Sequence, residues 1–408
     1  MNHSQFSGIV AVVVLLAIGF APHSFYYGAT DWERVYLPNS ARLLTGESIF
    51  QDAFVYPPFA AVLGLPSIGL PSWAVRVLFW LMNVVCGSVL IIASWNLAGG
   101  RFSLRPPKRE LIIAGLGLAT ALGFTFDVMV NRQTDLVVGA FTIGGCWLLL
   151  RQRGLAGTLS IGFAAAIKCT PLLFVPYLAF VGRWRAAVGV FVVAIGANLA
   201  VDVVFPPKSD QIRFVEWTQQ YLLPLGKVEP GKWHSAIGFN HSLSGIVNRS
   251  LRVNLVPHEN DWTETLVEPA PSKRIIQLIV YGTGAGLLLI ACFALWSERN
   301  SGTISPVGIG MTLCLMLLLS PMSSKPHFCV MVLPAWVLAR QAMERQRFSL
   351  LLLSGIAAVC GLVSNKDLLG GWAYGWLIWH GTIPAMVLLL FAGLAIGKQN
   401  KTVAGESG

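Results

Sequence analysis

Charged residues are scarce in this chain of 408 residues. Asp, Glu, Lys and Arg together make up 12% of it, whereas 55% of the residues are hydrophobic, and the mean hydropathy is +0.65. Ordinary soluble domains carry about 25% charged residues. The composition therefore excludes a soluble domain and predicts an all-α integral membrane protein.

The sequence also lacks the common signatures of metal and nucleotide sites. Its seven cysteines lie within or beside apolar segments, and none forms a C-x-x-C pair, so neither a disulfide framework nor a thiolate metal site is indicated. The patterns GxxxxGK[ST], HExxH and GxSxG are absent. No Lys or Arg precedes the first apolar run and no A-x-A site follows it, so we expect an uncleaved first span.

Basic residues outnumber acidic ones, and the formal net charge is +10. The cations fall in short clusters between apolar runs, which is typical of a polytopic protein and not of a nucleic-acid-binding surface. A spanning helix needs about 20 apolar residues. On this basis we expect about twelve spans, near residues 5–23, 73–98, 109–126, 134–150, 154–167, 170–182, 186–206, 275–296, 303–319, 327–341, 348–364 and 371–397.

The segment 56–70 is short and contains three prolines. We expect it to dip into the membrane from the outer face and return, because the short basic loops then all lie on one side. If it crossed, the count would be thirteen. The chain is predicted to be a single polytopic domain, residues 1–408, with both termini cytoplasmic and outer loops at 24–72 and 207–274. Each outer loop is predicted to carry an amphipathic surface helix, near Asp31 and near Asp210.

Polar residues gather at the outer ends of the predicted spans. Asp31 begins an amphipathic stretch that Gly46 should stop. Lys168 interrupts a long apolar run with Pro171 close behind it, and such a lysine should face a polar cavity or an anion. The alternative is a lysine that extends to the membrane interface. His327 opens a further apolar helix on the same predicted side.

Several short patterns follow one another along the chain. They are Asp31, Tyr36, Ala41, Leu43, Leu44 and Gly46; Tyr56-Pro57-Pro58; Asn131 and Gln133; Ala156 through Lys168 to Pro171; Arg183-Trp184-Arg185; Asn240 to Arg249; and Leu318 to Ala335. In this order they resemble the polyprenyl-phosphate-dependent glycosyltransferases of the GT-C superfamily, in particular the DUF2029 family, glycosyltransferase family 87, which includes mannosyltransferases. The chain departs from the family pattern at Arg132, where glycine is usual, and at Ser324-Lys325-Pro326 before His327.

The resemblance implies a GT-C fold and a hexosyltransferase activity. A sugar, expected to be mannose, would move with inversion from a polyprenyl-phosphate donor to a hydroxyl of a lipid or glycan acceptor on the outer face of the plasma membrane. Asp31 would be the general base, since one positioned carboxylate suffices for a single displacement. The expected donor-phosphate contacts are Lys168, Arg249, His327 and Arg132. The expected substrate-binding residues are Tyr36, Tyr56, Gln133, Asn240 and Ser242.

No cofactor is expected and nucleic acid is not an expected partner. A divalent metal at Asp31 and Glu33 is the disfavoured alternative, because a monophosphate leaving group has no diphosphate for a metal to bridge. Two other functions stay open at this point. One is a transporter or flippase of a lipid-linked solute, although its ionisable residues should lie near the middle of the spans. The other is a pentose transferase or ligase of the same superfamily.

Overall fold

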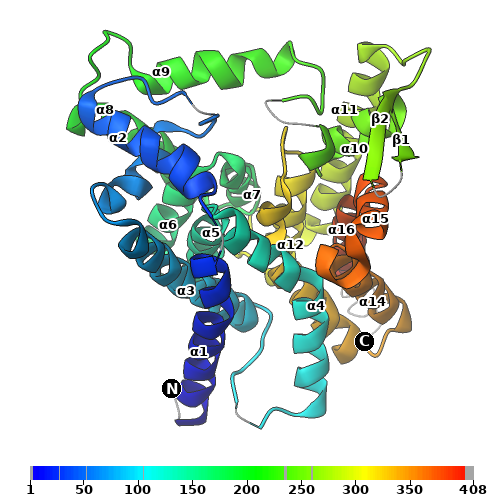
Figure 1. Ribbon diagram of the computed structural model, residues 1–408. Coiled ribbons are helices and arrows are strands. Elements are labelled where there is room, and N and C mark those ends of the chain that lie inside the picture. Colours follow the sequence, from blue (N-terminus) through cyan, green and yellow to red (C-terminus); the bar gives the residue numbers. More distant parts are fainter. Residues whose placement is uncertain are drawn as a thin grey trace. The chain divides into compact units, whose positions relative to one another are not determined.

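The computed structural model describes residues 3–26, 28–51, 53–103, 105–233, 237–258 and 261–399. The described residues form helices almost throughout, and their only strands are a single antiparallel hairpin (Figure 1). The contacts divide the chain into two compact units. Unit 1 comprises residues 1–96, 101–105 and 125–227, and unit 2 comprises 97–100, 106–124 and 228–408.

Unit 1 holds the first apolar helices and the first outer loop. Its elements are α1 (His3–Tyr26), η1 (Trp32–Tyr36), α2 (Leu37–Thr45), η2 (Pro58–Ser67), α3 (Ser72–Leu97), the end of α4 (Lys108–Asn131), α5 (Asp135–Leu150), α6 (Gly154–Ile167), η3 (Thr170–Leu173), α7 (Phe174–Phe180), α8 (Trp184–Val204), α9 (Arg213–Trp217), η4 (Thr218–Leu222) and η5 (Leu223–Gly226). Its core forms where α6 packs against both α5 and α8.

Unit 2 holds the rest of α4 and the remaining elements. They are η6 (Ile237–Phe239), α10 (Leu243–Arg252), β1 (Val253–His258), β2 (Asp261–Leu266), α11 (Lys273–Ala294), η7 (Trp296–Glu298), α12 (Pro306–Leu318), η8 (Lys325–Met331), α13 (Val332–Glu344), α14 (Phe348–Val363), α15 (Lys366–Trp379) and α16 (Thr382–Gln399). Nearly every residue of α12 and α13 is buried, so these two helices form the core of the unit. The hairpin β1–β2 was not predicted from the sequence.

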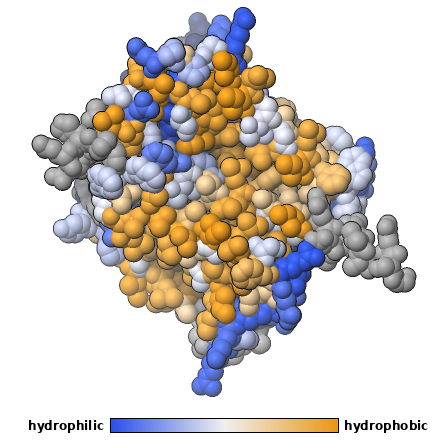
Figure 2. Space-filling view, turned by 90° about the vertical axis from the view of Figure 1, so that its right-hand side faces the viewer, coloured by the Kyte–Doolittle hydropathy of each residue, from blue (hydrophilic) through white to orange (hydrophobic). Residues whose placement is uncertain are grey.

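Apolar helices confirm the prediction of an all-α membrane protein. Five helices in the described ranges are long and apolar enough to cross a bilayer, namely α1, α3, α4, α8 and α11, and several shorter apolar helices accompany them. Figure 2 shows many hydrophobic side chains on the surface of the face that it draws. Exposed apolar side chains of this kind are expected of helices that face lipid.

The bounds predicted for the last span are wrong. Residues 371–397 do not form one helix, because α15 ends at Trp379 and α16 begins at Thr382. Gly381 lies between them with φ +89°, a left-handed conformation that glycine adopts without steric cost and that ends a helix. Helix α15 instead continues from α14 after a bend of 94°.

The short segment after the first outer loop is η2, a ten-residue 3-10 helix. At about 2 Å per residue it extends roughly 20 Å, less than the hydrocarbon core of about 30 Å; that it dips into the membrane and returns stays a prediction. Two hydrogen bonds attach it to its neighbours. Ser40 Oγ donates to the carbonyl of Ala61 at 2.6 Å, and the N–H of Phe59 donates to Asn198 Oδ1 at 2.8 Å.

Both predicted surface helices are present. The first runs from Asp31 through η1 and α2 and stops at Gly46, whose φ of +74° confirms the predicted C-terminal glycine. The second is α9 with η4, and it begins at Arg213 rather than at Asp210. Its Trp217 and Tyr221 are buried, so one face of this helix packs on protein.

Candidate active site

The candidate base lies at the start of the first surface helix, in unit 1. Helix begins at Asp31, but its carboxylate makes no capping bond to the helix. Glu33 makes the capping bond instead, because its Oε2 accepts from the backbone N–H of Thr30 at 3.1 Å. Thr30 and Glu33 have the T-x-x-E spacing of a capping box, a signal that the sequence analysis overlooked.

The residues that meet these acids come from the end of α4. Arg132 follows the helix with φ +48°, and the N–H of Gln133 bonds back to the carbonyl of Val128 at 3.1 Å, as in a Schellman ending. This left-handed position favours glycine, which explains why glycine is usual there in the family pattern. The turn places Arg132 and Gln133 side by side at the end of the helix.

Each of these two residues holds one acid of the surface helix. Gln133 Nε2 donates to Asp31 Oδ2 at 2.7 Å. Arg132 is fully buried, pairs with Glu33 Oε1 and donates to the carbonyl of Ser24 at 3.0 Å. Asp31 is therefore held by a neutral amide and Glu33 by a cation.

Lys168 lies at a helix break, as predicted, because α6 ends at Ile167 and Lys168 is extended. Its Nζ donates to both carboxylate oxygens of Asp135, at 2.8 and 2.9 Å, and both side chains are buried. Nζ also lies 5.2 Å from the centre of the Tyr56 ring. Asp135, the first residue of α5, was not among the predicted site residues, so this buried ion pair was not predicted.

A cluster of aromatic rings packs beside the residues of this site. Tyr36 stacks on Trp32 and on Tyr56, with ring centres 5.4 and 5.2 Å apart. Its hydroxyl lies 3.0 Å from Thr134 Oγ1. Burial, with further contributions from Tyr56 and Asp135, holds the pKa of Tyr36 well above its usual value, so the hydroxyl stays protonated. Tyr36 is fully buried, which makes it part of the wall of the site, whereas Tyr56 is half-buried.

In unit 2, Asn240 joins two loops. Its Nδ2 donates to the carbonyl of Pro321 at 2.8 Å, and its Oδ1 accepts from the N–H of Ser242 at 3.1 Å and of Ser323 at 3.2 Å. Ser242 caps α10 by accepting from the N–H of Gly245. Asn240 and Ser242, which were predicted to bind substrate, are both fully buried. Their hydrogen bonds hold the loops together.

Arg249 is fully buried in unit 2. Its guanidinium donates to the carbonyls of Trp379 at 2.7 Å, Asn240 at 2.7 Å and Ile378 at 3.2 Å. These bonds attach α10 to the end of α15, where the last carbonyls of a helix need donors. The guanidinium is thus engaged with the protein backbone at the position where a phosphate contact was expected.

His327 lies in the first turn of η8 and is half-buried. Its Nδ1 accepts from the N–H of Ser324 at 3.1 Å, within a capping box. The neighbouring Lys325 places its Nζ 4.9 Å from the centre of the Tyr374 ring. Of the four cations expected to bind phosphate, His327 alone is half-buried, since Lys168, Arg132 and Arg249 are all buried.

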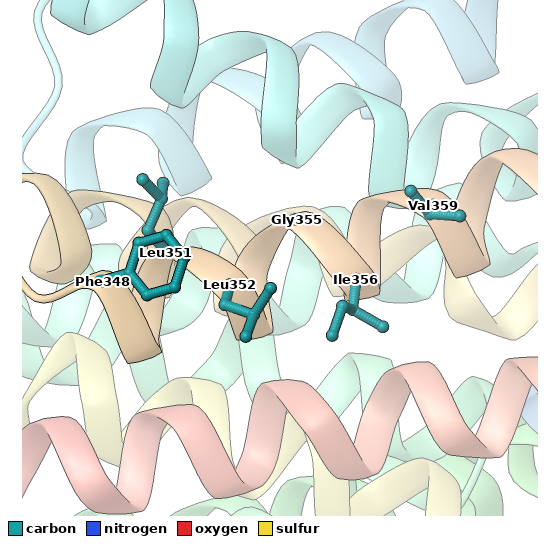
Figure 3. Close-up of a pocket in the computed structure, with 6 residues that line it drawn as sticks. All are labelled: Phe348, Leu351, Leu352, Gly355, Ile356 and Val359. Atoms are coloured by element: carbon teal, nitrogen blue, oxygen red, sulfur yellow. The ribbon is translucent and has the colours of Figure 1, made fainter.

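Two further observations on the described residues do not indicate a second reactive site. No group of three or more His, Cys, Asp or Glu side chains in these ranges is arranged to hold a metal ion. A groove runs along α14 and is lined only by apolar side chains and Gly355 (Figure 3). Phe348, Ile356 and Val359 on this helix are exposed, as expected of a helix that faces lipid.

Comparison with known proteins identifies relatives of this arrangement. The chain matches the family model "Glycosyltransferase family 87" over residues 54–321. It is 25% identical over 300 residues to the polyprenol-phosphate-mannose-dependent alpha-(1-2)-phosphatidylinositol pentamannoside mannosyltransferase of Mycobacterium tuberculosis (strain CDC 1551 / Oshkosh). That alignment covers 72% of this chain and 61% of the relative, so the chain matches about three fifths of that protein's length.

Among solved structures, the chain is similar to ArnT from Cupriavidus metallidurans bound to undecaprenyl phosphate. The TM-score is 0.43 and the sequence identity is 13%, and the match covers 97% of this chain and 78% of ArnT.

Proposed function

Since this chain belongs to glycosyltransferase family 87, which confirms the family expected from its motifs, we propose that it is a membrane hexosyltransferase with a polyprenyl-phosphate sugar donor. The sugar is mannose in our proposal, and the acceptor is a hydroxyl of a lipid or glycan. The curated relative depends on polyprenol-phosphate-mannose, as its name states, and this supports the choice of donor.

The proposed reaction is a single displacement with inversion. The acceptor oxygen attacks the anomeric carbon, the bond between that carbon and the phosphate oxygen breaks, and the hydroxyl proton passes to Asp31. The polyprenyl phosphate leaves with the bonding electron pair. A phosphate is already a fair leaving group, so cations and hydrogen-bond donors replace the second acid that glycosidases use.

The observation that carries the assignment of the base is the difference between three acids in unit 1. Glu33 is paired with the buried Arg132, and Asp135 with the buried Lys168. Removing either acid from its pair would leave a buried cation uncompensated, which is strongly unfavourable. Asp31 is bound by a neutral amide and is half-buried, so it can accept a proton without breaking an ion pair.

In this proposal Lys168 is the donor-phosphate contact of unit 1, where it would share its charge between Asp135 and the phosphate. His327, in unit 2, is a separate candidate for a contact to a lipid phosphate, because it is half-buried. Arg132 and Arg249 are engaged with protein acceptors, and we assign both a structural role. Tyr56 lies beside Lys168 and is proposed to border the donor, whereas Gln133 holds Asp31 and is proposed to border the acceptor.

We propose that transfer needs no metal ion. Asp31 and Glu33 have the spacing of an acidic metal motif, but Gln133 holds one and Arg132 holds the other, so the two carboxylates have different partners. Activity should persist in excess EDTA. Loss of activity in EDTA that is restored by Mg²⁺ or Mn²⁺ would contradict this part of the proposal.

The chain is a multi-pass membrane protein, and we propose the plasma membrane with the active site on the extracytoplasmic face. Single cysteines in a Cys-free background test the sidedness. An impermeant maleimide should label cysteines at Ser209 and Ser250 in intact cells, whereas Gln346 should react only after lysis. All three positions are exposed, so access to the compartment decides the result. Labelling of Gln346 from outside would contradict the topology.

The central test uses purified protein with radiolabelled polyprenyl-phosphate-mannose and a native lipid extract. Asp31→Asn keeps the size of the side chain but cannot take the proton, so transfer should fall roughly 100-fold or more. Glu47→Gln is the matched control, because Glu47 is an exposed acid of the same loop. Full activity of Asp31→Asn would overturn the assignment. Donor movement across vesicles without any transfer would favour a flippase instead.

A further inference from the structure

Two loops of unit 2 meet at His241. Its backbone N–H donates to the carbonyl of Ser323 at 2.7 Å, which joins the loop before α10 to the loop before η8. Its ring lies edge to face on Phe328, with ring centres 6.3 Å apart. The imidazole is therefore held in a fixed place between the two loops.

The imidazole of His241 is almost completely buried, with 4% of the residue exposed. Its Nδ1 forms no hydrogen bond to any group in the described residues. Buried polar atoms nearly always have a partner, and one without a partner calls for an explanation such as an absent ligand. The ring therefore offers a donor or acceptor that the protein itself does not use.

The groups around this ring are cationic or become so on protonation. Arg249 binds the carbonyl of the adjacent Asn240, and Lys325 and His327 follow the bonded Ser323. Burial, and then the charges of Arg249, Lys325 and His327, hold the pKa of His241 well below its usual value. The ring of His241 is therefore neutral and lies near cationic groups.

The N-terminus of α10 adds to the positive charge of these groups. Ser242 caps the helix directly after His241, and the first turn of a helix favours an anion through its N–H groups and dipole. A buried donor, nearby cations and a helix start together form a site for an anion with several acceptor oxygens. A phosphate group meets this description, because its oxygens can accept from separate donors.

We propose that His241, Lys325 and His327 bind the phosphate group of a lipid substrate. The nature of the substrate rests on the proposed function, and the phosphate could belong to a polyprenyl monophosphate or to a phospholipid acceptor. The neutral His241 donates from Nδ1, Lys325 supplies the charge and His327 donates from Nε2. Asn240 and Arg249 hold the two loops in register but do not touch the ligand.

The test measures binding to the purified full-length protein in detergent. The probes are farnesyl phosphate, dioctanoyl phosphatidylinositol and, as a phosphate-free control, farnesol; the readout is the shift of the thermal unfolding midpoint with probe concentration. Wild type should bind one of the two phosphates and not farnesol. Whichever phosphate binds identifies the donor or the acceptor as its source.

His241→Phe keeps an aromatic ring beside Phe328 and removes the donor, so the Kd of that phosphate should rise roughly tenfold or more. Lys325→Gln should have a similar effect and serves if His241→Phe does not fold. Arg274→Gln is the matched control, because Arg274 is an exposed cation of unit 2 outside these loops. Its Kd should equal that of wild type.

Three results would overturn the inference. They are wild-type affinity in both folded variants, equal binding of farnesol and farnesyl phosphate, and binding of neither phosphate by the wild type. A transfer assay keeps the two proposals apart. If wild type and His241→Phe transfer mannose equally well, the inference fails and the proposed function stands. If His241-dependent phosphate binding occurs without any transfer, the proposed function fails and the inference stands.

Discussion

Gln133 donates a hydrogen bond of 2.7 Å from its side-chain amide to Oδ2 of Asp31, a residue 102 positions earlier in the chain. The bond fixes the carboxylate through one oxygen, and in the proposed reaction the acceptor hydroxyl approaches the other. Gln133 is thus a positioning residue for the base. It can do this because Arg132, in the left-handed conformation before it, ends α4 at this point.

Gln133→Ala should lower kcat by about tenfold and leave the donor KM nearly unchanged, since misplaced catalytic groups lose rate more than binding. In Gln133→Glu the new carboxyl group would face Asp31, and a hydrogen bond between the two needs one proton on the new side chain. That proton is lost as the pH rises, so the pH profile of transfer by this variant should shift toward acid. A raised donor KM with normal kcat in Gln133→Ala would instead support the substrate-binding role expected from the sequence.

The pair Glu33–Arg132 should matter for folding more than for chemistry. Arg132 is fully buried, and removing one partner of a buried ion pair commonly costs about 3–5 kcal/mol. Because 20% of the Glu33 side chain is exposed, we expect the lower end of that range for Glu33→Gln. The measurements are the thermal unfolding midpoint and the transfer rate per folded molecule, which should stay within a few-fold of wild type.

Arg132→Gly offers a matched comparison for the same pair. Glycine suits the left-handed backbone at this position, so the combined variant Glu33→Gln/Arg132→Gly should unfold at a higher temperature than Glu33→Gln alone. If the combined variant is less stable than either single variant, the pair is not the reason for the loss. A folded but inactive Glu33→Gln would make Glu33 a candidate base.

Local rules of sequence predicted much of this arrangement. The surface helix at Asp31, its end at Gly46 and the helix break at Lys168 follow from capping, glycine and proline preferences that act within a few residues. The pairing of Lys168 with Asp135 could not be predicted in this way. The two residues are 33 positions apart and start or end different helices, so only the packing of α5 on α6 brings them together.

The same limit applies to the polar residues of unit 2. Asn240, Ser242 and Arg249 belong to one of the short patterns that carry the family resemblance, and such a pattern does not distinguish ligand contacts from loop contacts. Asn240 and Arg249 bond to Pro321 and Trp379, which lie in segments that no sequence pattern connects, whereas Ser242 makes a local capping bond with Gly245. His241, between them, was not selected because a single histidine in a polar loop carries no spacing signal.

Lys168 and Asp135 form the most buried ion pair of unit 1 among those described above, with exposed fractions of 6% and 5% for the side chains. Lys168→Met alone should leave Asp135 uncompensated and cost about 3–5 kcal/mol of stability. Lys168→Met/Asp135→Leu removes both charges, and an apolar replacement of a buried pair is often neutral. We expect this double variant to fold but to show a donor KM raised about tenfold or more, because the phosphate loses a cation.

The double variant separates the two roles of the lysine. Its unfolding midpoint reports on the ion pair, and its donor KM reports on the phosphate contact. Asp135→Leu alone is the control, since it should be unstable for the opposite reason, a lysine without its acid. Wild-type transfer by the folded double variant would show that Lys168 serves only the structure.

Helix α15 should lie along the membrane interface instead of crossing the membrane. It leaves α14 at 94° and carries Trp372 and Trp376, both exposed, and tryptophan favours the headgroup level. Arg249 ties its last carbonyls to α10. Helix α15 has a break at Gly370, so the label belongs after it. Nitroxide labels on single cysteines at Gly371 in α15 and at Ile356 in α14, both exposed, measure depth in proteoliposomes through collisions with oxygen and with a water-soluble nickel chelate. Gly371 should meet more nickel and less oxygen than Ile356. Equal depths would place α15 inside the hydrocarbon core, and α14 with α15 would then be one broken span.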